Sequence, residues 1–537
     1  MTFAMDRRTA LRLMTSTLAA AAVLGATPSL AAGVMSAFVQ SLAEAATDDA
    51  AIATFYRDHD YATLWTGPGD AERRQVLLDA FDMAPAHALP VERYAPAQIR
   101  ALFAAAQTEG DLGRLEVAMS RAYLAYVRDL SSGALLPSAV SADIKREAVR
   151  PDPALTLTRV AGGDLVGFLN TLAPVAPEYA RLVKEKFALE TVIAAGGYGA
   201  LIAAEAVGPD ASAAAVIQLR DRLIALGYLA LSASAAYDAD IQAAVQRFQF
   251  DSGIESDGVA GEGTVVALNV EAGERLKSVI VALERLRWMG QAPLGARHLW
   301  VNQPDFSVQV VDDGKTTFSS RVVIGKIGFD TESPEFSDQM EFMVINPTWS
   351  VPRSIAVKDY LPQFQKNANA QRQLQVIDRA GRVVPRDQID FAAYTPNNFP
   401  FALRQPPMDG NALGKVKFML PNPYNIYLHD TPTKSLFAKE VRAFSHGCIR
   451  VGLPFDLAYV LLAPQSDDPK GLFASYLAGG RESVLELATP VPVHLVYFTA
   501  WPNERGTISY RRDIYGRDAK VFAALTEAGV VLQGVQS

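Results

Sequence analysis

The N-terminal part of the chain has its apolar residues at helical spacing. One clear stripe recurs at steps of three and four residues and stops at Ser131-Ser132-Gly133, where we expect the helix to end. Its members are Leu115, Met119, Ala122, Tyr123, Tyr126 and Leu130. The same Ala- and Leu-rich pattern, punctuated by Pro and Gly, predicts a helical domain over 48–205.

A shorter helical pattern with a glycine-rich end follows. One amphipathic helix ends at Gly227-Tyr228, and a second runs into the sequence DSGIESDGVAGEGTVVALN, whose glycines mark tight turns. We expect a compact three-helix unit over 212–270. The next apolar stripe predicts a connecting helix over 271–290 that packs against the helical domain.

Beyond Gly290 the period changes from helical to alternating. Phe306, Val308 and Val310 alternate with polar residues, the chain turns at 312–315, and a second apolar run returns over 318–324. This pattern is typical of a β-hairpin.

We therefore predict a mostly β domain over 297–500. It is interrupted by a Pro- and Gln-containing segment at 351–424 with helices of its own, and a tail follows at 501–537. The predicted fold class is multidomain α+β.

Length and composition agree with several folded domains. At about 150 residues per domain, 537 residues predict three or four domains. Half of the residues are hydrophobic, which excludes a mostly disordered chain. The net charge of −8 lacks the electrostatic pattern of a nucleic-acid-binding protein. One cysteine, six scattered histidines and no HExxH pair indicate no metal, and we expect no cofactor.

The first residues resemble an export signal. Arg7 and Arg8 precede an apolar stretch over 13–26, and Ser29-Leu30-Ala31 fits a cleavage site, so we predict a signal peptide over 1–31. The paired arginines resemble a twin-arginine signal. An uncleaved anchoring helix is the alternative. No later stretch is long and apolar enough to span a membrane, so we expect a mature protein that is soluble outside the cytoplasm.

The single cysteine lies in a short loop of polar and small residues. Cys448 follows Ser445-His446-Gly447 and precedes Ile449-Arg450. Cysteine attacks as its thiolate, so a nucleophilic role requires a base within hydrogen-bond reach. A lone cysteine is more often a buried small residue, but this loop favours the catalytic interpretation.

Two histidines are candidates for the base. His446 is too close along the chain to aim its ring easily at the thiol, whereas His429 ends an alternating strand 19 residues before Cys448. We expect His429 to hold an imidazolium–thiolate pair with Cys448. The N–H groups of Gly447 and Cys448 are candidate oxyanion donors. Arg450 adds positive charge near the thiolate or binds a substrate carboxylate.

The residues HD…SHGCIR resemble the signature of the L,D-transpeptidase (YkuD-type) catalytic domain, and similar segments extend over most of the chain. They include LRDRLIALGYL with DGVAGEGTVVALN, which resembles a peptidoglycan-binding domain, and FYRDHDYATLW, which is similar to the helical scaffold domain of large Gram-negative members. Two further segments resemble parts of that catalytic domain. One is VINPTWSVPRSIAVKDYLP, which resembles the segment that borders the active site of the large members. The other, around MDGNALGK, resembles the segment that leads to their catalytic histidine.

The resemblance implies a role for each matching residue. Cys448 is the nucleophile, His429 the general base, and the backbone carbonyl of Asp430 its partner. His446, Ser445, Gly447 and Arg450 belong to the signature loop. The segment 351–424 resembles a substrate-capping insertion. We also expect Tyr427, Trp349 and Asn411 to contact substrate.

The implied activity is cross-linking of peptidoglycan in the periplasm, in cell-wall biogenesis. Cys448 would form a thioester with a tetrapeptide donor stem, and a diaminopimelate of an acceptor stem would resolve it into a 3→3 cross-link. Carbapenems would label the same thiol. Hydrolysis by water, cleavage of existing 3→3 bonds and lipoprotein attachment use the same nucleophile and stay open, as does a non-catalytic wall-binding protein. A papain-like protease is disfavoured, because its cysteine precedes its histidine.

Overall fold

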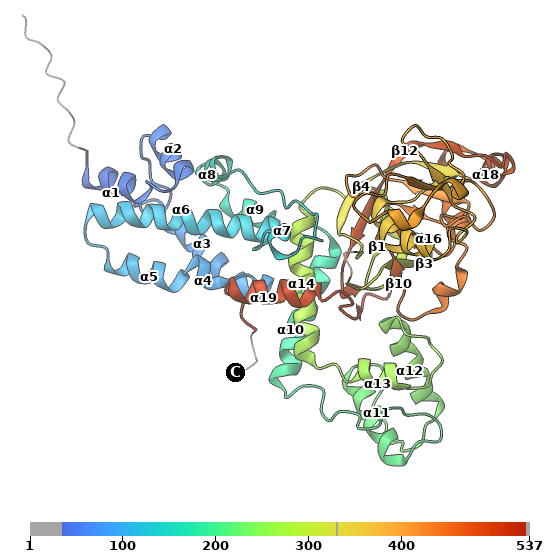
Figure 1. The fold of residues 1–537 in the computed structure, drawn as a ribbon. Helices are drawn as coiled ribbons and strands as arrows, with labels where there is room; N and C mark the ends of the chain where they lie inside the picture. The colour runs from blue at the N-terminus through green and yellow to red at the C-terminus, as the bar shows by residue number, and fades with distance from the viewer. Residues whose placement is uncertain (1–34, 329–330, 533–537) are drawn as a thin grey trace, which may run out of the picture.

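The computed structural model describes residues 35–328 and 331–532. The predicted signal peptide at 1–31 lies outside these residues. The chain forms a helical domain, a small helical unit and a β domain, which meet around helix α14 (Ala272–Met289) (Figure 1). This is a multidomain α+β architecture. Across the two described ranges, no helix combines the length and hydropathy needed to cross a bilayer.

The helical domain is built around the long helix α6 (Glu109–Ser132). A capping box between Thr108 and Asp111 starts this helix, and its buried face contains the predicted apolar stripe. Glu116 on the same face is fully buried, and its carboxylate accepts N–H bonds from Trp65 and Thr66. The other helices are α1 (Ala37–Ala45), α2 (Ala50–Asp58), α3 (Ala71–Asp82), η1 (Ala84–His87), α4 (Val91–Tyr94), α5 (Pro96–Ala105), α7 (Pro137–Val140), α8 (Pro153–Ala161), α9 (Leu165–Asn170) and α10 (Pro177–Ala194).

The three-helix unit comprises α11 (Ala213–Ala225), α12 (Ala239–Ser252) and α13 (Glu262–Leu268). Its glycine-rich turn is organised by Gln249, whose buried amide donates to the carbonyl oxygen of Val259 and accepts the N–H of Gly258. Gly258 has a φ of 76°, a conformation that favours glycine.

Helix α14 contacts the β domain and the C-terminal helix through buried ion pairs. Arg285 pairs with Glu335 of the β domain and with Asp518 of the C-terminal helix α19 (Arg517–Glu527). The Arg287–Glu284 pair on the same helix is also fully buried. Substitution of one partner would leave an uncompensated buried charge, at a cost of about 3–5 kcal/mol per pair.

The β domain contains a nine-stranded sheet in the order β10-β3-β11-β9-β8-β4-β12-β1-β2, and β2 also pairs with β3, so the sheet closes on itself. Its strands are β1 (Arg297–Asn302), β2 (Ser307–Asp312), β3 (Lys315–Gly325), β4 (Phe336–Ile345), β8 (Val416–Met419), β9 (Leu428–His429), β10 (Ala443–Ser445), β11 (Ile449–Val451) and β12 (Ser483–Val496). The helices α17 (Pro454–Leu462), η6 (Ala463–Gln465) and α18 (Pro469–Ala478) follow β11. One apolar core packs the inner face of the sheet against α17.

The insertion between β4 and β8 has its own apolar core and a three-stranded sheet in the order β5-β7-β6. Its elements are β5 (Trp349–Ser350), α15 (Arg353–Ile355), the π-helix η2 (Ala356–Tyr360), α16 (Leu361–Lys366), β6 (Gln375–Ile377), η3 (Arg386–Gln388), η4 (Phe391–Ala393) and β7 (Ala402–Gln405). Residues 416–419 of the predicted insertion instead form β8 of the main sheet. A 3-10 helix, η5 (Lys434–Ala438), follows β9.

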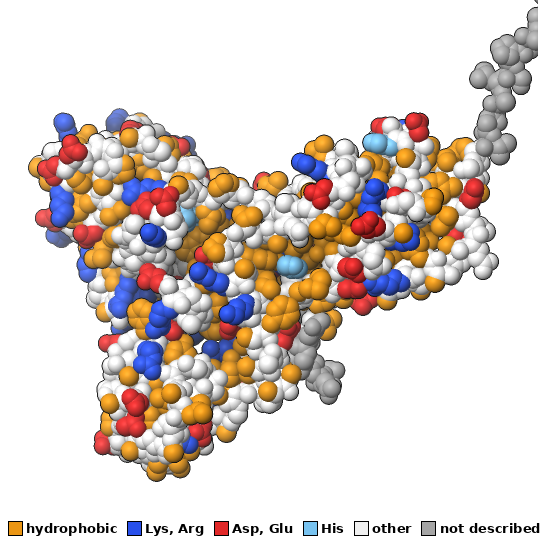
Figure 2. Space-filling view, turned by 180° about the vertical axis from the view of Figure 1, so that it is seen from behind, with side chains coloured by type: hydrophobic (Ala, Val, Ile, Leu, Met, Phe, Trp, Pro, Cys, Tyr) orange, Lys and Arg blue, Asp and Glu red, His pale blue; other side chains and the backbone are white. Residues whose placement is uncertain are grey.

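The chain beyond residue 500 is folded rather than a simple tail. Its hairpin, β13 (Ala500–Pro502) and β14 (Ile508–Tyr510), precedes α19. The hairpin region holds the three-helix unit, because the buried carboxylate of Asp251 on α12 accepts from Asn503 (3.0 Å) and pairs with Arg505. Figure 2 shows Lys and Arg side chains gathered where the β domain meets this unit.

Candidate active site

The register of three neighbouring strands gathers the candidate residues on one face of the sheet. His429 on β9 lies opposite Lys417 on β8 and opposite Arg450 on β11. Continuing the β9–β11 register by one residue places Cys448 beside Tyr427. Because side chains alternate along a strand, these five residues share one face, while their neighbours enter the apolar core.

The imidazole of His429 is oriented by a backbone carbonyl. Its Nδ1 is 2.5 Å from the carbonyl oxygen of Asp430, so Nδ1 carries the proton and donates. Nε2 is then left unprotonated, as a general base requires. Burial, with Arg450 and Lys417 nearby, lowers the pKa of His429 to about 3.

The carboxylate of Asp430 bonds neighbouring backbone and side-chain groups and not the imidazole of His429. Its carboxylate accepts the N–H of Lys415 (2.9 Å) and of Thr431 (2.7 Å) and pairs with the ammonium of Lys434 (2.6 Å). This agrees with the carbonyl, and not the carboxylate, as the group that contacts His429.

The thiol of Cys448 contacts a backbone carbonyl. Its Sγ lies 3.6 Å from the carbonyl oxygen of Asn425, to which it donates. Burial raises the pKa of Cys448 to about 11, although Lys417 and Arg450 favour the thiolate. Burial disfavours the charged form of both Cys448 and His429, and so opposes the imidazolium–thiolate pair that the sequence leads us to expect.

Ser445 fixes the loop that carries Cys448. Its buried hydroxyl donates to the carbonyl oxygen of Cys448 (2.6 Å) and accepts the N–H of Gly447 (3.2 Å). Ser333 also donates to the Gly447 carbonyl (2.6 Å). The Gly447 N–H, expected as an oxyanion donor, is thus already paired. The Cys448 N–H has no acceptor within the described residues.

His446 points toward the insertion and away from a role as base. Its Nε2 lies 3.1 Å from the Asp359 carboxylate, in the π-helix η2. Burial and Lys326 lower the pKa of His446 and so favour its neutral ring, which can still donate this hydrogen bond. π-Helical turns often occur at functional sites, and this one borders the loop of Cys448.

Arg450 is a cation without a protein partner in the described structure. Its Nε is buried and unpaired, and no carboxylate lies within ion-pair distance. Burial lowers its pKa, whereas Cys448 and Tyr360 of the insertion raise it. Both expected roles, charge near the thiolate and binding of a substrate carboxylate, remain compatible with this position.

The three residues expected to contact substrate have different surroundings. Tyr427 lies beside Cys448 and packs against the insertion. Trp349 is mostly buried in the core of the insertion, with its ring edge-on to Tyr360. Asn411 is only 1% exposed, and its amide bonds the carbonyl oxygens of Pro347 (3.1 Å) and Pro406 (3.0 Å). We therefore revise Asn411 to a structural residue.

Two groups of the site escaped the sequence analysis. Lys417 and the backbone carbonyl of Asn425 both approach Cys448, and both line a cavity of about 400 Å³ that is bordered by the β8–β9 connection. The alternation in Val416-Lys417-Phe418 signals that Lys417 faces away from the core, but its neighbours depend on the strand register.

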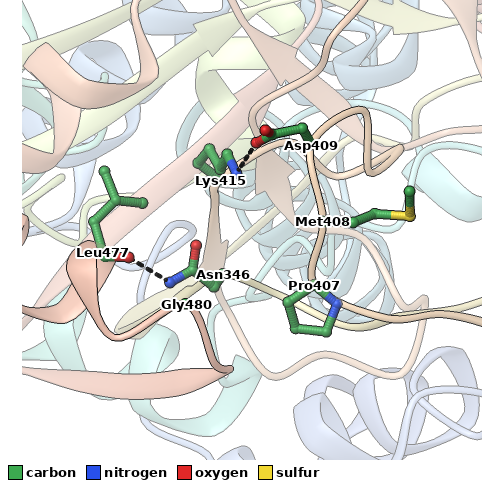
Figure 3. A pocket seen from close by; sticks show the side chains of 7 residues that line it. All are labelled: Asn346, Pro407, Met408, Asp409, Lys415, Leu477 and Gly480. Atoms are coloured by element: carbon green, nitrogen blue, oxygen red, sulfur yellow. Dashed lines mark hydrogen bonds and ion pairs between the residues drawn. The ribbon is translucent and has the colours of Figure 1, made fainter.

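A second cavity, of about 330 Å³, lies between the insertion and the end of α18 (Figure 3). There Asn346 donates to the carbonyl oxygen of Leu477 (3.0 Å), and Lys415 pairs with Asp409 (2.6 Å). Cys448 and His429 line neither cavity, but Asn425, which lines the cavity of about 400 Å³, accepts from the Cys448 thiol through its backbone carbonyl, so we associate that cavity with the candidate site.

Comparison with known proteins gives three family matches along the chain. Residues 50–185 match a family described as "Scaffold domain", and residues 212–268 match one described as "Putative peptidoglycan binding domain". Residues 296–470 match the family described as "L,D-transpeptidase catalytic domain".

A curated protein of Haemophilus influenzae, described as "Putative L,D-transpeptidase", is 34% identical over 230 residues. The match covers 42% of this chain and 45% of that protein, so the chain spans less than half the length of this relative.

Two solved structures are similar to parts of the chain. An L,D-transpeptidase from Stackebrandtia nassauensis is 15% identical, with 52% of this chain and 88% of that chain covered and a TM-score of 0.21. An L,D-transpeptidase from Xylanimonas cellulosilytica is 15% identical, with 54% and 95% covered and a TM-score of 0.17. Along its length the chain thus matches first a scaffold domain, then a peptidoglycan-binding domain and then, at residues 296–470, an L,D-transpeptidase catalytic domain.

Proposed function

We propose that this protein is a peptidoglycan L,D-transpeptidase that forms 3→3 cross-links through a thioester on Cys448. The observation that supports this most is the bond from His429 Nδ1–H to the Asp430 carbonyl, because it leaves Nε2 free to accept a proton on the sheet face that also carries the single thiol of the chain.

In the acylation step, His429 takes the thiol proton as sulfur attacks. The Cys448 sulfur forms a bond to the carbonyl carbon of the third stem residue, a diaminopimelate. The bond from that carbon to the nitrogen of the terminal D-Ala then breaks, and His429 gives its proton to the departing amine. Because burial disfavours the charged forms of Cys448 and His429, we infer that proton transfer accompanies the attack. The free Cys448 N–H is the candidate donor to the developing oxyanion.

In the transfer step, an amine of a second stem attacks the thioester. The new C–N bond forms, the C–S bond breaks, and the amine proton passes through His429 back to sulfur. When the amine belongs to the side chain of a diaminopimelate, the product is a 3→3 cross-link. When water attacks instead, the product is a tripeptide and the enzyme acts as an L,D-carboxypeptidase.

The surrounding domains fit an enzyme that acts on an insoluble polymer. The three-helix unit is held to the β domain through Asp251, so binding of peptidoglycan by this unit would raise the local concentration of stems near Cys448. Such an enzyme works in the periplasm, in agreement with the export signal predicted at 1–31.

Incubation of the mature protein with disaccharide-tetrapeptides, followed by mass spectrometry of the products, tests the proposal. We expect cross-linked dimers that contain one tripeptide donor, together with released D-Ala. Tripeptide without dimers would contradict the cross-linking activity and would indicate a carboxypeptidase. The absence of any product would contradict both.

A further inference from the structure

Lys417 occupies a position for which the proposed mechanism has no role yet. It lies opposite His429 in the β8–β9 register, and its ammonium is 4.6 Å from the centre of the Tyr427 ring. The rings of Tyr427 and His429 are in turn 5.7 Å apart. The ammonium, the Tyr427 ring and the His429 ring thus lie close together on the sheet face that also carries Cys448.

The charge of Lys417 is half-buried and has no protein counterpart. No carboxylate of the described chain lies within ion-pair distance of it, although Glu482 acts on it from farther away. Two residues earlier, Lys415 pairs with Asp409 at 2.6 Å. A desolvated cation without a partner is costly, and a bound anion would offset that cost.

The cavity beside Lys417 is large enough for a small amino acid. Its volume is about 400 Å³, and its lining includes Lys417, Asn425 and Tyr427. Because the carbonyl of Asn425 contacts the Cys448 thiol, the cavity adjoins the reacting sulfur. The rest of the lining is mostly apolar and comes from the β8–β9 connection, so Lys417 is the only charged group in it.

The two amines in the proposed reaction share one chemical feature. The leaving D-Ala carries its amine on a D-configured carbon that also bears a carboxylate. The acceptor diaminopimelate carries its attacking amine on a D-configured carbon that likewise bears a carboxylate. Since attack retraces the path of departure, both amines occupy the same place relative to His429 and both carboxylates fall at the same point.

We propose that Lys417 and this cavity form a subsite for the α-carboxylate of the D-amino acid whose amine leaves or attacks at Cys448. The inference rests on the proposed function and extends it to the choice of acceptor. Arg450 flanks His429 from the opposite strand and is free to bind a second carboxylate of the donor stem. Lys417 thus positions the amine for deprotonation by His429 and disfavours water, which has no carboxylate.

The test compares two acceptors that differ only in the carboxylate. The full-length mature enzyme receives an unlabelled tetrapeptide donor with isotope-labelled D-alanine or labelled D-alaninamide, and incorporation is measured by mass spectrometry. We expect the wild type to prefer D-alanine by about tenfold, as expected for one charge-assisted hydrogen bond. Lys417→Met should reduce this preference to within about twofold and raise the share of hydrolysis, whereas Lys417→Arg should retain the preference.

Lys415→Met is the matched control, because that ammonium is paired outside the cavity, and it should keep the wild-type preference. A preference that persists in Lys417→Met would overturn the subsite while leaving acylation, measured as release of unlabelled D-Ala, intact. If Lys417→Met loses acylation, restoration by Lys417→Arg supports the subsite and lack of restoration overturns it. If the wild type releases no D-Ala, the proposed function itself fails.

Discussion

The ring of His429 is held by the carbonyl oxygen of Asp430, the residue that directly follows it, at 2.5 Å from Nδ1. The tautomer of the candidate base is therefore set by the backbone at the end of β9. The carboxylate of the same aspartate is occupied with Lys415, Thr431 and Lys434. The backbone carbonyl of Asp430 therefore orients His429, whereas its carboxylate holds the loop, and substitution of the side chain can separate these two roles.

Asp430→Ala should affect stability more than chemistry. It removes the acceptor of the Lys415 N–H, and an unpaired buried donor costs about 1–3 kcal/mol of the free energy of unfolding. The carbonyl remains, so kcat of the folded protein should fall by less than about tenfold, whereas His429→Gln should lower it by about 10²–10⁴. Urea denaturation and D-Ala release measure the two quantities. Equal loss of kcat in both variants would contradict the separation.

The thiol should be a poor nucleophile toward a small reagent. Burial raises the pKa of Cys448 to about 11, so the thiolate fraction, and with it alkylation by iodoacetamide, should still increase above pH 9. At pH 7 this fraction should be about two orders of magnitude below that of a free cysteine. Because the pKa of His429 is lowered to about 3, its neutral form persists at pH 5, and acylation should not decline near pH 6.5. An alkylation plateau by pH 7 would instead indicate a resting ion pair.

The contact between His446 and Asp359 should tune substrate binding only modestly. Both side chains are partly exposed, so the bond contributes less than about 1 kcal/mol. Asp359→Asn retains an acceptor for the neutral ring and should leave KM for a tetrapeptide donor nearly unchanged, while Asp359→Ala should raise KM by up to about fivefold with little change in kcat. A collapse of kcat in Asp359→Ala would show that η2 takes part in the chemistry.

Asn411 should prove structural. Its buried amide connects the start of the insertion at Pro347 to the loop at Pro406, and Asn411→Ala would leave those carbonyl groups unpaired. We expect the free energy of unfolding to fall by about 1–3 kcal/mol, with KM of the folded fraction unchanged. A raised KM without loss of stability would restore Asn411 to the substrate site.

The sequence predicts the identity of the central pair but not its electrostatics. Cys448 and His429 are recognisable because the SHGCIR loop and an alternating strand each have a local signature. Their protonation states depend on how deeply the folded chain buries them, which no local pattern encodes. Lys417 escaped notice for a related reason, since its place opposite His429 depends on the length and turns of the β8–β9 connection.

In the domain organisation, too, local sequence patterns predict the elements but not the contacts between them. The helical periods predict α6 and α14, because each buries an apolar face along its own length. The packing of α19 on α14 depends on Arg285 meeting Asp518, a contact across 233 residues that alternation and spacing do not reveal. For Asn411 the sequence suggests a substrate contact, whereas in the structure its side chain bonds the backbone of its own loop. A polar residue in a loop near the site is equally suited to either role.

The most direct measurement is peptide mapping of the enzyme after acid quenching with a disaccharide-tetrapeptide. We predict an adduct with the mass of the disaccharide-tripeptide acyl group on the peptide that contains Cys448, and no adduct in Cys448→Ala, which should also resist labelling by a carbapenem. An adduct on another residue, or one that persists in Cys448→Ala, would contradict the assignment of Cys448 as the nucleophile.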